Sequence, residues 1–366
     1  MKNIICLVGT RPECVKMAPV IRALNATDWA KTTIVSTGQH RELVHQTLGM
    51  FDLSPDIDLD VMVPNQTLSG LSGRIFMKFD PLFEDKSFDL VLVQGDTTSV
   101  MIAALVSFYR KVPVGHVEAG LRTHNLHKPF PEELNRVMTS LVTALHFAPT
   151  QASRQNLVDE RIPDERIFVT GNTVIDALLD VAARDLPCDY PMNPANRLVL
   201  VTAHRRENFG EPLVQICAAI RDLHDRHSNL EFVYPVHPNP NVTGPVHAAL
   251  GGLERVHLIP PADYSALVML MKNSYFILTD SGGIQEEAPA LGKPVLVMRD
   301  ETERPEAVES GIALLVGADK GRIVHAAERL LADPAFYKEL AKGVSPYGDG
   351  NAAQRISDAC RVYLSV

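Results

Sequence analysis

The stretch LTDSGGIQEEAPALGKPVLV, residues 278–297, joins an apolar run, a glycine turn and the start of a helical pattern. Such a turn leaves backbone N–H groups unpaired where the helix dipole is positive, which suits a phosphate group. The adjacent Glu286 and Glu287 stand one to two turns into the helix, where a carboxylate can accept hydrogen bonds from ribose hydroxyls. The glycines alone favour an ordinary strand-to-helix turn. The carboxylates and the segment RDETERPE, residues 299–306, favour a nucleotide.

Short apolar runs alternate with helical patterns along the whole chain. This alternation predicts βαβ units and an α/β fold whose parallel strands are covered on both faces. The expected strands are 3–8, 32–36, 90–93, 113–116, 145–148, 198–201, 231–234, 256–259, 275–278, 294–297 and 313–316. The expected helices are 14–24, 41–50, 68–83, 99–109, 133–143, 152–159, 212–226, 264–271, 284–291 and 320–331.

A proline-rich segment at 186–196, LPCDYPMNPAN, interrupts this alternation and predicts a linker. We therefore expect two Rossmann-like, doubly wound parallel-sheet domains that face a cleft, at 1–185 and 197–350. An amphipathic helix at 351–366 is predicted to pack back on the N-terminal domain. Ligands of open α/β sheets bind outside the carboxyl ends of the strands, so the loops at those ends are the candidate sites.

Composition limits the class of protein. A chain of 366 residues with 46% hydrophobic and 22% charged residues is expected to be globular and to form two domains. The net charge of −9 argues against nucleic acid as the main partner. No apolar run is long enough to span a membrane, and the N-terminal run lacks the features of a signal peptide. Five widely spaced cysteines without a CxxC pair predict neither a disulfide framework nor a zinc site, so we expect a cytoplasmic protein.

Two loops of the first half contain candidate polar residues. Arg11 and Lys16 follow the first expected strand and lie near a helix N-terminus, where they either face a phosphate or form a solvated first turn. Asp96 follows the strand 90–93 at a position typical of a helix N-cap, so capping is its simplest role.

Two further carboxylates of the first half extend this set. Glu118 directly follows an apolar strand, and Glu132 stands beside Glu133 in the acidic first turn of a helix. Glu133 fits that helical role, whereas the role of Glu132 stays open. Together with Asp96, Glu118 and Glu132 would line one wall of the cleft and raise one another's pKa values, as acid/base catalysis requires. A divalent metal site is the alternative.

The second half supplies donors for an anion. His204 is followed by two arginines at a strand end, and the rigid segment 234–241, YPVHPNPN, brings His237 to the same edge. Arg304 precedes a short helix beside the glycine turn.

These loops together resemble one family. GTRPE with Lys16, GDTTS, GHVEAGLRT, PEELNR, GNTVID, HRREN, YPVHPNPNV, TDSGGIQEEAP and ERPEAV occur in the order found in the non-hydrolysing UDP-N-acetylglucosamine 2-epimerases. The resemblance covers essentially the whole chain. It implies the two-domain GT-B fold, interconversion of UDP-GlcNAc and UDP-ManNAc for cell-surface polysaccharide synthesis, and a homodimer. It implies no cofactor, and we expect no required metal ion.

The resemblance also implies roles for individual residues. The turn Ser281-Gly282-Gly283 would hold the diphosphate with Arg11, Lys16 and His204, and His204 is also a candidate catalytic residue. Glu287 would bind the ribose hydroxyls and Arg304 would lie beside the nucleotide, which leaves Glu286 as a surface or local partner. The family's proposed acid/base carboxylates correspond to Asp96, Glu118 and Glu132. Pro289 is expected near the first turn of a short or bent helix.

Some positions depart from the family pattern. Relatives often have Gln and Phe near the uridine where this chain has Ala262 and Leu267. Some members bind a second, activating UDP-GlcNAc, for which Gln39, His40, Gln66 and His237 would fit. Glu42 and Asn65 replace a glutamine and a basic residue of those members.

The expected chemistry is an anti elimination of UDP that gives 2-acetamidoglucal, followed by re-addition of UDP. Direct deprotonation at C2 would be slow because no carbonyl group lies next to that carbon. The alternatives are a 2-epimerase for a UDP-2,3-diacetamido uronic acid sugar, a GT-B glycosyltransferase that uses a UDP-sugar, and a catalytically silent UDP-sugar-binding regulator.

Overall fold

The computed structural model describes residues 1–38, 41–184, 186–187, 190, 193–302 and 304–366. The chain forms two compact units, Met1–Ala177 with Tyr347–Val366, and Leu178–Pro346. This division lies within helix α8 (Thr173–Ala183) and not at the expected boundary of 185 or in the segment 186–196. Asp176, before the division, accepts a hydrogen bond of 2.8 Å from the backbone N–H of Ala353 in the first unit. Ala182, after it, accepts one of 2.8 Å from Lys272 in the second.

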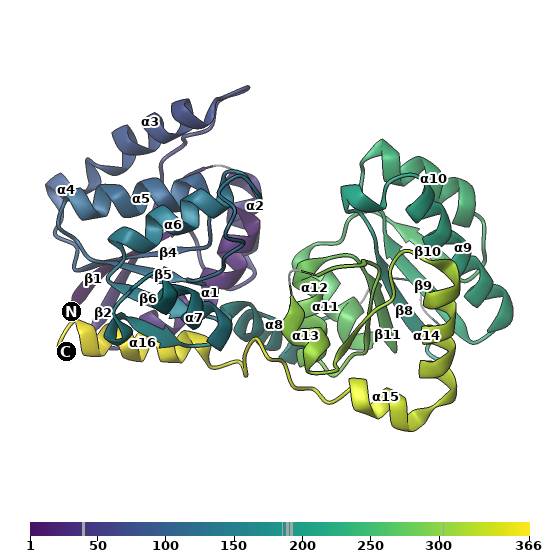
Figure 1. The fold of residues 1–366 in the computed structure, drawn as a ribbon. Helices are drawn as coiled ribbons and strands as arrows, with labels where there is room; N and C mark the ends of the chain where they lie inside the picture. Colours follow the sequence, from purple (N-terminus) through teal and green to yellow (C-terminus); the bar gives the residue numbers. More distant parts are fainter. Residues whose placement is uncertain (39–40, 185, 188–189, 191–192, 303) are drawn as a thin grey trace. The chain divides into compact units, whose positions relative to one another are not determined.

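The first unit is built on a seven-stranded sheet in the order β3-β2-β1-β4-β5-β6-β7, and every paired strand is parallel. The strands are β1 (Lys2–Val8), β2 (Ala30–Ser36), β3 (Ile57–Asp58), β4 (Leu90–Gln94), β5 (Val114–Val117), β6 (Leu145–Ala148) and β7 (Ile167–Val169). The other helices are α1 (Arg11–Asn25), α2 (Arg41–Gly49), α3 (Leu68–Phe79), α4 (Leu82–Asp85), α5 (Thr98–Tyr109), α6 (Glu132–Val142), α7 (Gln151–Asp159), η1 (Asp164–Arg166) and α16 (Ala352–Tyr363) (Figure 1).

The second unit has a six-stranded parallel sheet in the order β10-β9-β8-β11-β12-β13. Its strands are β8 (Arg197–Thr202), β9 (Leu230–Pro235), β10 (Val256–Ile259), β11 (Phe276–Thr279), β12 (Val295–Val297) and β13 (Ala313–Leu315). Its remaining helices are η2 (Arg206–Asn208), α9 (Glu211–Arg226), α10 (Pro240–Leu250), α11 (Tyr264–Asn273), α12 (Gly282–Ala290), α13 (Pro305–Glu309), α14 (Lys320–Ala332) and α15 (Pro334–Leu340). The expectation of two doubly wound parallel sheets is confirmed.

The central strand β1 shows why its sequence is almost wholly apolar. Successive side chains of a strand point to opposite faces. Ile4 and Cys6 belong to a core cluster with residues of α1 and α16, whereas Ile5 and Leu7 belong to a second cluster with residues of α3 and α5. Both faces of the strand are therefore buried, and α16 completes the core of the first unit.

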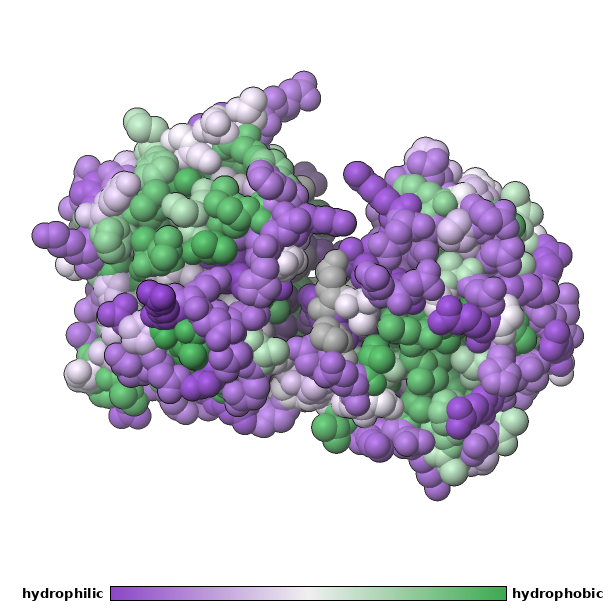
Figure 2. Space-filling view, in the orientation of Figure 1, coloured by the Kyte–Doolittle hydropathy of each residue, from purple (hydrophilic) through white to green (hydrophobic). Residues whose placement is uncertain are grey.

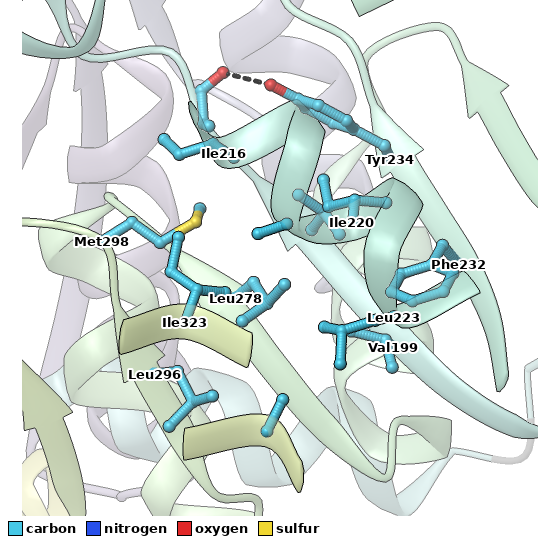
Figure 3. Close-up of a cluster of buried hydrophobic side chains, with 14 of the residues drawn as sticks. Val199, Ile216, Ile220, Leu223, Phe232, Tyr234, Leu278, Leu296, Met298 and Ile323 are labelled. Atoms are coloured by element: carbon cyan, nitrogen blue, oxygen red, sulfur yellow. Dashed lines mark hydrogen bonds between the residues drawn. The ribbon is translucent and has the colours of Figure 1, made fainter. Parts of the chain in front are cut away.

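A core cluster of the second unit packs residues of α9, α10 and α14 against one face of the sheet. Figure 3 shows Ile220 and Leu223 of α9 beside Phe232 of β9. Tyr234 is fully buried, and its hydroxyl donates a hydrogen bond of 2.7 Å to the carbonyl oxygen of Ala203. This bond satisfies the polar end of a large buried ring and fixes the backbone directly after β8.

Several elements differ from the sequence prediction. The strands β3 and β7 and the helices α8, α10 and α15 were not expected. The short helix expected at Arg304 is α13, and the helix expected at 68–83 is interrupted near Pro81. The segment 234–241, which was expected to be a rigid loop, contains the start of α10. Asn239 caps this helix and Pro240 occupies its first position. Pro289 lies in the last turn of α12 and not near the first, so it removes only an N–H close to the point where the helix ends.

Each sheet has one point where the direction of strand order reverses. The reversal lies between β1 and β4 in the first unit, and between β8 and β11 in the second. Ligands of doubly wound sheets bind outside the carboxyl ends of the strands at such switch points. The loops that follow these four strands contain GTRPE, GDTTS, HRREN and DSGG. Topology thus singles out the loops that the sequence had indicated.

Two buried histidines in neighbouring strands should make stability depend on pH. His116 and His146 are directly paired across β5 and β6, and neither has exposed surface. Burial lowers the pKa of His116 to about 4 and that of His146 to about 3. The unfolded chain would bind protons on both imidazoles near their ordinary pKa of 6.5, whereas the folded chain would not. The stabilising effect of the neutral rings is therefore present above pH 6.5 and is lost as the pH falls toward 4.

We expect the free energy of unfolding to fall over this interval with a slope of up to about 1.4 kcal/mol per pH unit for each histidine. Denaturant titrations between pH 4.5 and 7.5 measure this slope. The variant His146→Leu should reduce it, whereas the exposed-site control His127→Gln should not. An equal slope in the wild-type protein and His146→Leu would contradict the prediction.

Candidate active site

Glu118 is the most heavily bonded of the candidate carboxylates. It directly follows β5 in a left-handed backbone conformation, with φ at 65°, and the residue is 8% exposed. Lys16 of α1 places its Nζ 2.6 and 2.7 Å from the two carboxylate oxygens. Asn172, which precedes α8, donates a hydrogen bond of 3.1 Å, and Gln94 at the end of β4 donates another. These three donors stabilise the ionised form of Glu118.

Asp96 follows β4 but does not cap the next helix. Thr97 is the N-cap of α5, and its hydroxyl accepts from the backbone N–H of Val100. The Asp96 carboxylate instead lies 3.0 Å from Nη1 of Arg136, and its backbone carbonyl accepts from the Asn135 side chain at 2.8 Å. Both partners belong to α6. The simplest sequence hypothesis for Asp96 was therefore wrong, and its carboxylate is available for another role.

The surroundings of Asp96 shift its protonation. Burial raises the pKa of Asp96, the guanidinium of Arg136 lowers it, and the charges of Glu118 and Glu132 raise it further. The charges of Glu118 and Glu132 therefore act on Asp96, and a shared cleft wall of the three carboxylates stays a prediction. Glu132 is the first residue of α6 and is half-buried.

Glu133 does more than begin a helix. Its carboxylate accepts hydrogen bonds from the backbone N–H groups of Thr123 and His124, at 2.9 and 2.8 Å, and lies 3.1 Å from Arg136. It therefore fixes the loop after β5 and orients the arginine that pairs with Asp96. Its spacing in the sequence gave no sign of this second role.

The loop after β1 contributes a buried carboxylate of its own. Glu13 forms a capping box with Thr10 at the start of α1, and it accepts from the N–H of Gly9 at 2.5 Å. Burial raises the pKa of Glu13 to about 7. Arg11 is half-buried in the first turn, and no ion pair joins it to a carboxylate in the described part of the chain. Lys16, expected at a diphosphate, is instead bonded to Glu118.

A divalent metal site was the alternative use of these carboxylates. Within the residues that the structure describes, no group of three or more His, Cys, Asp or Glu side chains is arranged to hold a metal ion. The charges of Asp96 and Glu118 are compensated by Arg136 and Lys16.

In the second unit, Asp280 joins the two loops at the switch point. It follows β11 and has no exposed surface. Its Oδ2 accepts from the backbone N–H groups of His204 and Arg205, both at 2.8 Å, and from the side chain of Asn208 at 3.0 Å. One carboxylate thus holds the HRREN loop against the DSGG turn. No sequence motif predicted this role for Asp280; an aspartate directly after a strand was the available signal.

The glycine turn forms the N-terminus of α12, as expected. Ser281 is its N-cap but makes no side-chain capping bond, and the helix begins at Gly282. A Cβ on Gly282 would lie 3.5 Å from Nη2 of Arg205, so this guanidinium stands beside the first turn. The positive end of the helix and an arginine therefore meet at one place, which suits an anion. Arg205 belongs to the predicted loop but was not singled out.

His204 lies beside the same loops. Its ring stacks on that of His237, with centroids 5.6 Å apart and an interplanar angle of 11°. Burial lowers the pKa of His204, the negative charge of Asp280 raises it, and the charges of His237 and Arg205 lower it. The sequence had predicted that the two histidines reach the same edge, and the structure confirms this.

The two glutamates of α12 have different partners. Glu287 is 5% exposed and accepts a hydrogen bond of 2.9 Å from the hydroxyl of Tyr264 at the start of α11. Glu286 is also buried and accepts from Nε of Arg304. Of the two roles expected for Glu286, pairing with a nearby side chain is confirmed, because Arg304 bonds to it. The other role, a residue on the helix surface, is wrong, because Glu286 is buried. Arg304, expected beside a nucleotide, is bonded to this buried carboxylate.

Comparison with known proteins identifies the family. The family model described as UDP-N-acetylglucosamine 2-epimerase matches residues 22–361. This chain belongs to the UDP-N-acetylglucosamine 2-epimerase family. It is 50% identical to the UDP-N-acetylglucosamine 2-epimerase of Yersinia pestis, with 98% of each chain covered. Members of this family are isomerases.

Solved structures of UDP-N-acetylglucosamine 2-epimerases share the fold. A structure from Listeria monocytogenes, described as a putative member, has a TM-score of 0.93 at 42% identity and covers 100% of this chain and 97% of that one. The Neisseria meningitidis enzyme, solved bound to UDP-GlcNAc, has a TM-score of 0.86 at 44% identity and covers 98% and 99%. The fold is therefore GT-B-like, as the resemblance implied.

The residues expected at a second UDP-GlcNAc site of the epimerase family are only partly described. Gln39 and His40 lie outside the described residues. Gln66 accepts hydrogen bonds from Arg74 and from the N–H of Val63, and His237 stacks on His204. Ala262 and Leu267, which replace the Gln and Phe expected near the uridine, are both half-buried; Ala262 precedes α11 and Leu267 lies in its first turn.

Proposed function

We propose that this chain catalyses the reversible epimerisation of UDP-N-acetylglucosamine at C2, which gives UDP-N-acetylmannosamine for cell-surface polysaccharide synthesis. The reaction proceeds by anti elimination of UDP to 2-acetamidoglucal and by re-addition of UDP. Membership of the epimerase family supports the reaction, and the relative solved bound to UDP-GlcNAc supports the substrate.

The second unit binds the UDP portion in this proposal. The diphosphate lies at the N-terminus of α12, where the turn 281–283 and the side chains of His204 and Arg205 provide donors. Glu287 accepts the ribose hydroxyls, and its existing bond to Tyr264 holds it in position. Arg304 contributes indirectly by fixing Glu286 and thereby the first turns of α12. Removal of one preorganised donor to a developing anion costs roughly 3–4 kcal/mol in other enzymes.

The first unit supplies the acid/base groups, and the contrast between two carboxylates is the observation that supports the chemistry best. Lys16, Gln94 and Asn172 donate hydrogen bonds to Glu118. Burial raises the pKa of Asp96, with Arg136 acting against it and the charges of Glu118 and Glu132 adding to it. Carboxylates whose environments separate their pKa values can serve as base and acid on opposite faces of one carbon. Glu132 completes the set through its charge on Asp96. The carboxylates titrate as a coupled group.

An isotope experiment tests the reaction. UDP-GlcNAc is incubated with the protein in deuterated water without an acceptor, and the products are followed by NMR. We expect UDP-ManNAc with deuterium at C2, together with slow release of free UDP and the glycal. A product without solvent deuterium at C2 would contradict the elimination mechanism. An unchanged sugar would favour a glycosyltransferase, and faster turnover of a UDP-2,3-diacetamido uronic acid sugar would favour the related epimerase.

A homodimer is part of the proposal. The helices α3, α5 and α6 are neighbours, and large apolar side chains on them are exposed: Met77, Phe108, Tyr109, Met138 and Leu141. Figure 2 shows hydrophobic surface gathered over α5 and α6. A pocket of about 870 Å³ adjoins this surface. Apolar patches of this kind are typical of subunit contacts, and sedimentation analysis tests the dimer.

We also propose a cytoplasmic location. Cys6, Cys14, Cys217 and Cys360 are free and buried in the described part of the chain, as reducing conditions would leave them. Among the described helices, none is long and apolar enough to cross a membrane.

A further inference from the structure

We propose that Asp280 is a positioning residue that enables His204 to take up a proton when the diphosphate of the substrate binds. His204 then holds the departing UDP as an imidazolium ion. This inference rests on the proposed function, because it requires the UDP portion to bind at the N-terminus of α12. The proposed function already has His204 bind the diphosphate. The new elements are the role of Asp280 and the change of His204 from a neutral to a positively charged ring.

The two oxygens of the Asp280 carboxylate have different surroundings. Oδ2 accepts the three hydrogen bonds that join the loops after β8 and β11. Oδ1 is buried, has no hydrogen-bond partner in the described part of the chain, and lies 3.6 Å from Nδ1 of His204. The charge of Asp280 favours the protonated form of His204. The unsatisfied oxygen therefore presents negative charge to the imidazole.

The distance between the two groups determines how Asp280 acts on His204. At 3.6 Å from Oδ1, Nδ1 of His204 is beyond hydrogen-bond range, so Asp280 acts on the ring through its charge. The side chain of His204 is 40% exposed, so a ligand can reach it.

The charges around His204 come from three loops. Asp280 follows β11, His237 follows β9 and stacks on the ring, and Arg205 is the next residue of the same loop. Burial, His237 and Arg205 disfavour the imidazolium, whereas Asp280 favours it. The two negative charges of a diphosphate at the N-terminus of α12 would reverse this balance.

The consequence for the reaction is electrostatic. When the C1–O bond of the sugar breaks, its electron pair stays with the UDP oxygen and the charge of the diphosphate increases. An imidazolium can donate a hydrogen bond to that diphosphate, and the positive charge makes this bond stronger than one from a neutral ring. Re-addition of UDP reverses the step, so the proton remains on His204 throughout.

Isothermal titration calorimetry measures the proton uptake. UDP-GlcNAc is titrated into the full chain between pH 6.5 and 8 in buffers of different ionisation enthalpy, and the buffer-dependent heat gives the protons taken up per site. UDP-GlcNAc has no group that titrates in this range, and epimerisation consumes no protons, so the uptake reports the protein. We expect a clear net uptake in the wild-type protein and a loss of most of it in Asp280→Asn and in His204→Gln.

The control Asp225→Asn, at an exposed aspartate on α9, should keep the wild-type uptake. Because His204 is partly exposed, His204→Gln tests the proposal even where Asp280→Asn does not fold. Nitrogen-15 shifts of the histidine rings provide a second readout: the His204 signals, assigned by their absence in His204→Gln, should become those of an imidazolium on binding.

The outcomes separate the two hypotheses. If the wild-type protein does not bind UDP-GlcNAc, the proposed function fails. If it binds without proton uptake, or if either variant retains the full uptake, the inference is overturned while the proposed function stands.

Discussion

Replacing Asp96 with asparagine is expected to lower kcat by about 10²–10⁴-fold, the contribution typical of a positioned acid or base. The amide is nearly the same size as the carboxylate but neither donates nor accepts a proton near neutral pH. Arg136 keeps its second partner, Glu133, at 3.1 Å, and the bond from Asn135 goes to the backbone of residue 96. The fold around position 96 should therefore be retained.

The affinity for UDP separates a catalytic role of Asp96 from a structural one. In the proposed function UDP binds mainly through residues of the second unit, so its Kd should change by no more than about twofold, a free-energy change below about 0.5 kcal/mol. The control Asp159→Asn, on an exposed face of α7, should leave both kcat and Kd unchanged. If the affinity for UDP collapses together with activity in Asp96→Asn, Asp96 is a structural residue.

The strands could be predicted because parallel strands covered on both faces need continuous apolar runs. The runs at 3–8, 90–93 and 198–201 met this condition, and they became β1, β4 and β8. The strands β3 and β7 have two and three residues and are partly exposed, so they produce no such run. The unit boundary was missed for another reason: α8 is one continuous helix, and composition does not reveal that its two ends bond to different units.

The candidate loops could also be predicted, since loops after strands meet at one edge of a sheet. What the sequence could not reveal is which side chain bonds to which. Asp96 and Thr97 are both good caps, and only the geometry shows that Thr97 caps α5. The bonds of Asp280 to residues 72–76 positions earlier in the chain depend on the tertiary structure. Short sequence patterns do not predict contacts between residues so far apart in the chain.

Loss of the Lys16 amine should affect stability as well as activity. The side chain of Glu118 is 6% exposed and that of Lys16 is 18% exposed, and their charged atoms lie 2.6 Å apart. Lys16→Met would remove the cation bonded to this buried carboxylate, and breaking a buried ion pair in this way typically costs about 3–5 kcal/mol. Glu118 would also lose the contact with the Lys16 amine that holds its carboxylate in place, so kcat/KM should fall by about 10²-fold or more.

A double-mutant cycle distinguishes the charge effect from lost packing. Glu118→Gln removes the carboxylate, so the variant Lys16→Met/Glu118→Gln should be more stable than Lys16→Met by about 1–3 kcal/mol, without recovering activity. Lys2→Met, which breaks the more exposed pair with Asp89 at 3.4 Å, should change stability by less than about 1 kcal/mol. Denaturant unfolding and initial rates measure both quantities. If the two single variants and the double variant show strictly additive changes in stability, the Lys16–Glu118 pair does not compensate a buried charge, and Glu118 would need another source for its ionised state.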